Sequence, residues 1–118
     1  MKPVILCYEK CTTCKKALKW VEEKGCEFQT RPVKEENPSV EELKQWHEQS
    51  GLPLKRFFNT SGNLYKELKL KDRLPQMSDE EQYQLLSTDG MLVKRPLLVT
   101  ENGVCPGFSQ EQWEKLLG

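Results

Sequence analysis

Two cysteines near the start of the chain, Cys11 and Cys14, have the spacing of a functional thiol pair. Cysteines separated by two residues occur in structural zinc sites, in structural disulfides and in redox centres. A zinc site needs four ligands, and no other cysteine or histidine lies at ligand spacing from the pair. The pair therefore favours redox chemistry, with a zinc clamp and an idle structural pair as the alternatives.

The thiol pair lies between a predicted strand and a predicted helix. Residues 4–8 form a short apolar run typical of a strand, and apolar residues at helical spacing predict a helix over residues 12–25. Either Thr12 or Thr13 can cap the start of this helix. Cys11 would then stand at the helix N-terminus.

Cys11 is predicted to be the nucleophile of the pair. The positive end of a helix dipole and its unpaired backbone N–H groups favour a thiolate over a thiol. Nearby lysines would act in the same direction, namely Lys10, Lys15 and Lys16. We expect a lowered pKa for Cys11, and we expect Cys14, one turn into the helix, to resolve the mixed disulfide.

The rest of the sequence predicts one α/β domain over residues 1–118. Residues 26–33 alternate as a second strand, which completes a βαβ unit. Residues 38–89 contain two Ser-x-x-Glu capping boxes and are predicted to be a mostly helical insertion. Two further strands and a closing helix follow, at residues 95–100, 103–105 and 109–117. This order predicts a thioredoxin-like (glutaredoxin-like) βαβ–ββα core with a four-stranded mixed sheet.

Arg95 and Pro96 open the predicted third strand. X-Pro bonds are where cis peptide bonds occur, and in the thioredoxin fold a cis-proline lies against the thiol pair. We expect Pro96 to be that residue, while a trans-proline that starts the strand is the other possibility. Arg95 would be either a solvated charge or a cation that faces Cys11 and stabilises its thiolate or binds an anion.

Four stretches together resemble the arsenate reductase/Spx family of bacterial thioredoxin-fold proteins, over essentially the whole chain. They are CTTCKKA (11–17), GNLYKEL (62–68), KRPL (94–97) and GFS (107–109). The resemblance implies a reactive Cys11 and an Arg95 beside a cis-Pro96. We predict catalytic roles for Cys11, Cys14 and Arg95. Substrate contacts are predicted for Thr12, Thr13, Lys15 and Pro96.

The resemblance implies two kinds of function. One is a thiol-disulfide oxidoreductase or arsenate reductase-like enzyme, with glutathione, glutaredoxin or thioredoxin as external reductant. The other is an Spx-like transcriptional regulator, switched by oxidation, that docks RNA polymerase or another protein. Arsenate reductases of the family bind the oxyanion with further arginines, and near those positions this sequence has Asn59 and Gly107. Arg95 alone would orient arsenate poorly, which argues against arsenate as the substrate.

The composition limits which partners and which cellular compartment we expect for the protein. Lys and Arg total 18, as do Asp and Glu, so the chain has no basic surplus to attract nucleic acid. No apolar run is long enough to cross a membrane. Five cysteines without an export signal favour the cytoplasm. We expect a small thiol, a protein disulfide or an oxyanion as substrate, a protein as possible partner, and no bound metal or organic cofactor.

The remaining cysteines and the single histidine are given no chemical role by the sequence. Cys7, Cys26 and Cys105 are predicted to be small buried apolar residues rather than a third redox partner of the pair. His47 has charged neighbours and is predicted to be exposed on a helix.

Overall fold

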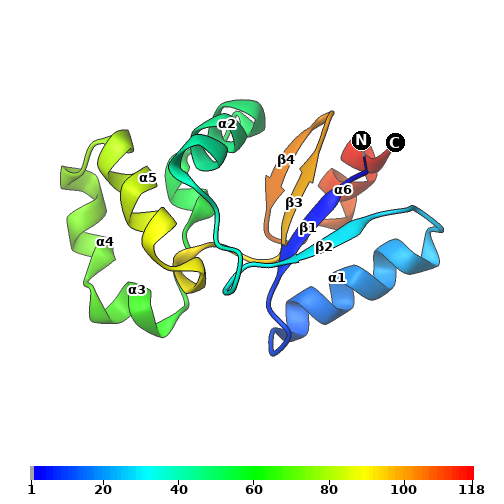
Figure 1. Ribbon diagram of the computed structural model, residues 1–118, viewed down its shortest axis with the longest axis horizontal. Coiled ribbons are helices and arrows are strands. Elements are labelled where there is room, and N and C mark those ends of the chain that lie inside the picture. Colours follow the sequence, from blue (N-terminus) through cyan, green and yellow to red (C-terminus); the bar gives the residue numbers. More distant parts are fainter. Residues whose placement is uncertain (1) are drawn as a thin grey trace.

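A four-stranded mixed sheet forms the centre of the computed structural model, which describes residues 2–118 (Figure 1). The strand order is β2-β1-β3-β4. The strands are β1 (Val4–Cys7), β2 (Gln29–Pro32), β3 (Leu97–Thr100) and β4 (Gly103–Pro106). Helix α1 (Thr12–Glu23) joins β1 to β2, which are parallel, and the other two pairings are antiparallel. The thioredoxin-like core predicted from the sequence is confirmed.

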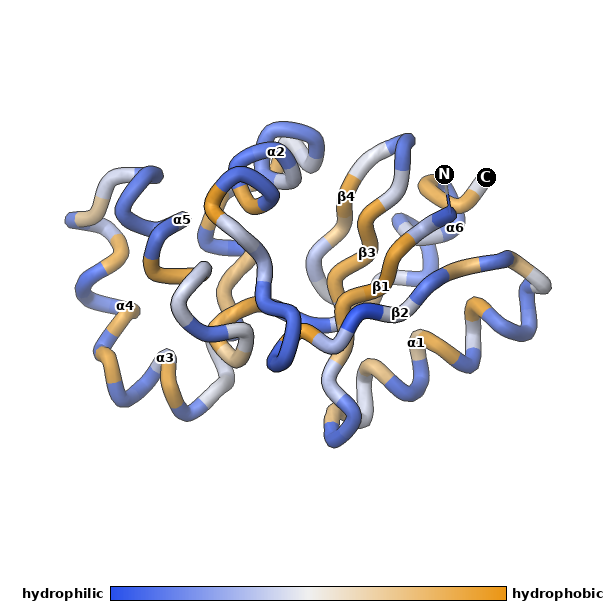
Figure 2. The backbone as a smooth tube through the Cα atoms, in the orientation of Figure 1, coloured by the Kyte–Doolittle hydropathy of each residue, from blue (hydrophilic) through white to orange (hydrophobic). Residues whose placement is uncertain are grey.

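Side-chain alternation along the strands divides the core between the two faces of the sheet. Ile5 of β1 points into one cluster with Ala17 and Val21 of α1 and with Trp113 of α6 (Gln110–Leu117). Its neighbour Leu6 points into the other cluster. In Figure 1, α1 and α6 lie on one side of the sheet and the remaining helices on the other. In Figure 2 the tube is orange along much of β1, β3 and β4, whereas β2 at the edge of the sheet is blue to white.

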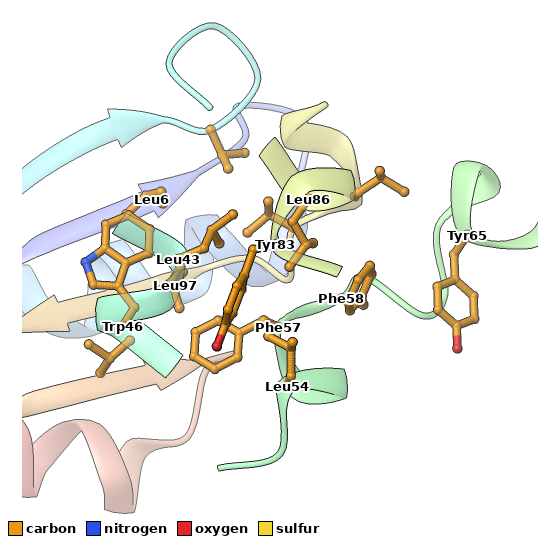
Figure 3. Close-up of a cluster of buried hydrophobic side chains, with 14 of the residues drawn as sticks. Leu6, Leu43, Trp46, Leu54, Phe57, Phe58, Tyr65, Tyr83, Leu86 and Leu97 are labelled. Atoms are coloured by element: carbon orange, nitrogen blue, oxygen red, sulfur yellow. The ribbon is translucent and has the colours of Figure 1, made fainter. Parts of the chain in front are cut away.

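The segment between β2 and β3 is mostly helical. It holds α2 (Val40–Ser50), α3 (Asn63–Glu67), α4 (Leu70–Arg73), α5 (Asp79–Thr88) and three short 3₁₀ helices at Leu54–Phe57, Leu74–Gln76 and Gly90–Leu92. Both predicted capping boxes are present, at the N-termini of α2 and α5. These helices surround the larger of the two clusters, which includes Trp46 of α2, Phe57 and Tyr83 of α5 (Figure 3).

Element ends differ from the predictions by a few residues. The second strand begins at Gln29, because Cys26 and Phe28 pack against the α1 and α6 side of the sheet before the chain joins β1. At the start of α6, the Ser109 hydroxyl accepts from the Gln112 N–H at 3.4 Å, without the reciprocal bond that would complete a capping box. Over the described part of the chain, no helix is long and apolar enough to cross a membrane.

Candidate thiol site

Cys11 itself caps helix α1, so the prediction that Thr12 or Thr13 would do so is wrong. Its backbone is extended (φ −90°, ψ 117°), and its sulfur accepts a hydrogen bond from the Cys14 N–H at 3.4 Å. The Cys11 N–H donates to the Tyr8 carbonyl at 3.0 Å, which turns the chain between β1 and α1. Thr12 and Thr13 come after the cap and have exposed side chains. The sulfur therefore occupies the position at which helix N–H groups converge.

The surroundings of Cys11 favour its thiolate. Partial burial raises its pKa. The hydrogen bonds from the Cys14 S–H and N–H groups, the charge of Arg95 and the hydrogen bond from the Thr13 N–H together lower the pKa by more than burial raises it. The pKa of Cys11 is therefore below the ordinary value. Arg95 is the cation with the largest effect, whereas the three lysines expected to act here have exposed side chains.

Cys14 is held in the opposite state. Its side chain is 1% exposed. Burial, followed by its hydrogen bond to Cys11 and the charges of Cys11 and Cys7, raises the pKa of Cys14 to about 12, against a lowering by the Tyr8 backbone N–H. One sulfur is thus partly exposed and activated, while the other is covered and protonated.

Arg95 reaches the thiol site from the start of β3. The Arg95–Pro96 peptide bond is cis, and Pro96 is buried. The guanidinium lies over the Tyr8 ring, 5.1 Å from its centre, and its Nη1 donates to the Met91 carbonyl at 3.3 Å. These contacts hold the guanidinium of Arg95 close to Cys11, and its positive charge lowers the pKa of that thiol. Of the two possibilities for Arg95, the structure therefore supports the one in which it faces Cys11.

A groove of about 750 Å³ runs from the start of α1 along β4. Thr13 and Arg95 line it, together with two further cations, Arg56 and Lys94. Among the described residues that line the groove, none is acidic. Thr12 and Lys15 are exposed on the first turn of α1 outside its lining. Neither Cys11 nor Cys14 is among its lining residues, so the groove approaches the thiol pair only through Thr13 and Arg95. Its cations suit it to a polar or anionic molecule.

A smaller hollow of about 320 Å³ lies on another side of Arg95. Asn59 lines it, and Gly107 lines the larger groove. Both positions singled out for their lack of an arginine are therefore near Arg95. Neither Asn59 nor Gly107 carries a charge. Arg95 is the single arginine among the described residues that line the smaller hollow.

Sequence reasoning missed Tyr8 and Arg56. Tyr8 supplies the ring under Arg95 and the carbonyl that receives the Cys11 N–H. Its position three residues before Cys11 could have indicated this role. The N–H groups at the start of a helix have no partner within the helix, and a carbonyl of the preceding loop can accept a hydrogen bond there. Arg56 lies in a 3₁₀ helix far along the chain, and no local pattern connects it with the thiols.

The remaining predictions about cysteines and histidine are partly wrong. Cys105 is buried as expected, but Cys7 and Cys26 are only half-buried. His47 is half-buried rather than exposed, because its Nδ1 lies 2.7 Å from the Tyr83 hydroxyl of α5. Among the described residues, no group of three or more Cys, His, Asp or Glu side chains could hold a metal ion.

The fold and site together define a thioredoxin-fold protein with a Cys-x-x-Cys pair at the start of its first helix. The ArsC family model matches residues 6–116, and the chain belongs to this family. A crystal structure of an ArsC family related protein from Bacteroides fragilis is 57% identical, covers 98% of this chain and 99% of its own, and superposes with a TM-score of 0.95.

Among the other relatives, one is named as an enzyme and one as a transcriptional regulator. An arsenate reductase from Vibrio cholerae is 32% identical, with a TM-score of 0.87 and coverage of 99% of this chain and 98% of its own. The protein YusI of Bacillus subtilis (strain 168) is 53% identical over 108 residues, 92% of each chain. The global transcriptional regulator Spx of the same strain is 25% identical over 107 residues, 91% of this chain and 80% of its own.

Proposed function

We propose that the protein is a thiol-disulfide oxidoreductase with Cys11 as nucleophile and Cys14 as resolving thiol. The observation that carries this proposal is the contrast between the two sulfurs: the pKa of Cys11 is lowered, and that of Cys14 is raised to about 12 by burial and by Cys11 itself. The pair thus has one thiolate ready to react and one thiol held in reserve.

The reaction balances as two exchange steps. The Cys11 thiolate attacks one sulfur of a substrate disulfide, forms a mixed disulfide and releases the other sulfur as a thiolate. Cys11 then has neither a charge nor a strong acceptor, so two of the causes that raise the pKa of Cys14 are lost. Cys14 gives up its proton to solvent and attacks the Cys11 sulfur. The product leaves as a thiolate, and a Cys11–Cys14 disulfide remains.

Glutathione, glutaredoxin or thioredoxin in the cytoplasm would supply the two electrons that restore the pair. The substrate favoured by the site is a small-molecule or protein disulfide with polar or acidic groups, because the cations Arg56, Lys94 and Arg95 line the adjacent groove. Arsenate is a weaker candidate, because neither Asn59 nor Gly107 supplies a second guanidinium at its position beside Arg95, although Arg56 lines the larger groove.

The test is reduction of oxidised glutathione and of a protein disulfide, followed by mass spectrometry of the enzyme. Cys11→Ser should abolish turnover, and Cys14→Ser should accumulate the substrate thiol as an adduct on Cys11. Cys26→Ser is the matched control, because Cys26 lies beyond the far end of α1 and should leave turnover unchanged. Full turnover by Cys11→Ser with every disulfide would contradict the proposal.

A redox-switched regulator is the second candidate, favoured by the similarity to Spx over 107 residues together with the thiol pair. In this case oxidation of Cys11 and Cys14 changes a surface that docks RNA polymerase or another protein. Purified RNA polymerase should be retained by immobilised protein in one redox state and not in the other. Equal retention in both states, or none in either, would dismiss this candidate.

A further inference from the structure

Cys7 lies beside the thiol pair and has no part in the two exchange steps. It is the last residue of β1, and along that strand it alternates to the same face of the sheet as Ile5. This is the face covered by α1, on which Cys14 shares the buried side with Ala17 and Val21. Cys7 and Cys14 therefore both point into the seam between β1 and α1.

The loop between β1 and α1 closes the distance between these two residues. The Cys11 N–H donates to the Tyr8 carbonyl at 3.0 Å, which folds the chain back at the end of the strand. The Tyr8 N–H is close enough to the Cys14 sulfur to lower the pKa of Cys14, and the charge of Cys7 acts on the same sulfur. That N–H belongs to the peptide bond that joins Cys7 to Tyr8, so the Cys14 sulfur lies near the end of β1 at which Cys7 stands.

The other two cysteines are far from this seam. Cys26 follows the opposite end of α1, a helix of 12 residues that spans roughly 18 Å. Cys105 lies in β4, two strands away from β1 and therefore roughly 10 Å across the sheet. Cys7 is half-buried, so solvent can take its proton.

We propose that Cys7 is a third redox thiol, which forms a disulfide with Cys14 and thereby releases Cys11 from the oxidised pair. This inference rests on the proposed function, because it starts from the Cys11–Cys14 disulfide. The Cys7 thiol loses its proton to solvent, and its sulfur attacks the Cys14 sulfur. The Cys7–Cys14 bond forms as the Cys11–Cys14 bond breaks, and Cys11 leaves as a thiolate. One disulfide is exchanged for another, so no oxidant or reductant is consumed.

The direction of this exchange follows from the acidity of the three thiols. Thiol-disulfide exchange expels the more acidic thiol faster, and near neutrality it favours the disulfide that leaves the most acidic thiol free. Cys11 has the lowered pKa. Burial and the charge of Cys11 raise the pKa of Cys7, and the second of these causes disappears once Cys11 is oxidised. The exchange should therefore accelerate with increasing pH.

Tryptic mapping distinguishes the two disulfides. Trypsin cuts after Lys10 and Lys15 and does not cut before Pro3, so Cys7 is on the peptide of residues 1–10 while Cys11 and Cys14 share the peptide of residues 11–15. A Cys11–Cys14 bond stays within one peptide. A Cys7–Cys14 bond joins the two. The protein is oxidised with diamide, its free thiols are blocked with N-ethylmaleimide in denaturant at mildly acidic pH, and the tryptic digest is analysed by mass spectrometry.

The expected result for the wild-type protein is a joined species of peptides 1–10 and 11–15, with fragmentation placing the bond at Cys14. Cys7→Ser should lose it, and Cys26→Ser should match the wild type. Cys11→Ser has no Cys11–Cys14 disulfide from which the exchange can start, so it should form the joined species only by direct oxidation with diamide and more slowly than the wild type. An internal bridge in peptide 11–15 without any joined species would overturn the role of Cys7, as would a bond from Cys7 to Cys11. Absence of every bridge would instead contradict the proposed function itself, so the two failures are distinguishable.

Discussion

The Cys14 backbone N–H donates a hydrogen bond to the Cys11 sulfur at 3.4 Å. This bond connects the two cysteines across the first turn of α1 while both thiols remain free. A helix N-cap is normally an oxygen that accepts from an N–H two or three residues later. Here a sulfur fills this role, so the local hydrogen bonds that start the helix also stabilise negative charge on the nucleophile.

Arg95 should contribute to the acidity of Cys11 through its charge. We expect Arg95→Gln to shift the pH midpoint of Cys11 alkylation upward and to slow alkylation at neutral pH roughly two- to fivefold, the effect of a charge pair near the surface. Iodoacetamide kinetics followed by mass spectrometry would measure this effect.

Lys94→Gln is the matched control for Arg95, because Lys94 also lines the groove but does not lie over Tyr8. It should leave the alkylation midpoint of Cys11 close to that of the wild type. Equal shifts in the two variants would mean that the overall charge of the groove, rather than the position of Arg95, sets the acidity of Cys11.

The ion pair between Arg31 and Glu42 should stabilise the junction between β2 and α2. Arg31 Nη1 lies 2.6 Å from Glu42 Oε2, and Nη2 lies 3.0 Å from Oε1. The same carboxylate closes the capping box with Ser39. We expect Glu42→Gln to lower the free energy of unfolding by about 1–2 kcal/mol at neutral pH, as measured by urea unfolding.

This contribution should depend on pH in a defined direction. The hydrogen bond from Arg31 is the largest cause that holds the pKa of Glu42 below its ordinary value, with support from Ser39. A lowered native pKa adds stability that is complete above the unfolded pKa of about 4.3 and is lost as the pH falls through the native pKa. The difference between wild type and Glu42→Gln should therefore shrink in acid. Glu41→Gln, an exposed neighbour, should show no such difference at either pH.

Gly90 should tolerate no side chain. A Cβ atom at this position would overlap the Val33 carbonyl oxygen and lie 2.6 Å from the carbonyl carbon. Because both atoms belong to the backbone just after β2, the clash cannot be relieved by a side-chain rotation. We expect Gly90→Ala to cost more than about 3 kcal/mol in thermal or urea unfolding.

Gly25 provides a useful comparison with Gly90. It has a left-handed φ of +75°, and a Cβ atom added there would meet no heavy atom within 4 Å. Gly25→Ala should therefore cost only the roughly 1–2 kcal/mol of left-handed strain. If the two substitutions were equally mild, the close approach of Gly90 to Val33 would be contradicted.

The order of the elements could be predicted because it depends on local signals. Ser39 with Glu42 and Ser78 with Glu81 mark helix starts within four residues, and the Asn-Gly turn marks the final hairpin. The thioredoxin-like core and the membership of the family followed from that order and from the quoted motifs.

The features that sequence reasoning missed depend on contacts between distant residues. Arg95 lies over Tyr8, 87 positions earlier in the chain, and His47 meets Tyr83 across the packing of α2 against α5. The N-cap was assigned to a threonine because hydroxyl oxygens cap more often than sulfur. In the folded chain the extended backbone of Cys11, rather than the residue type, decides which side chain faces the free N–H groups.

Titration of the ultraviolet thiolate absorbance shows whether the first turn of α1 and Arg95 hold Cys11 as a thiolate. The difference between reduced wild type and Cys11→Ser isolates this one sulfur. We expect a midpoint clearly below the value of about 8.5 for a free cysteine. A midpoint at or above that value would mean that neither the helix start nor Arg95 activates Cys11.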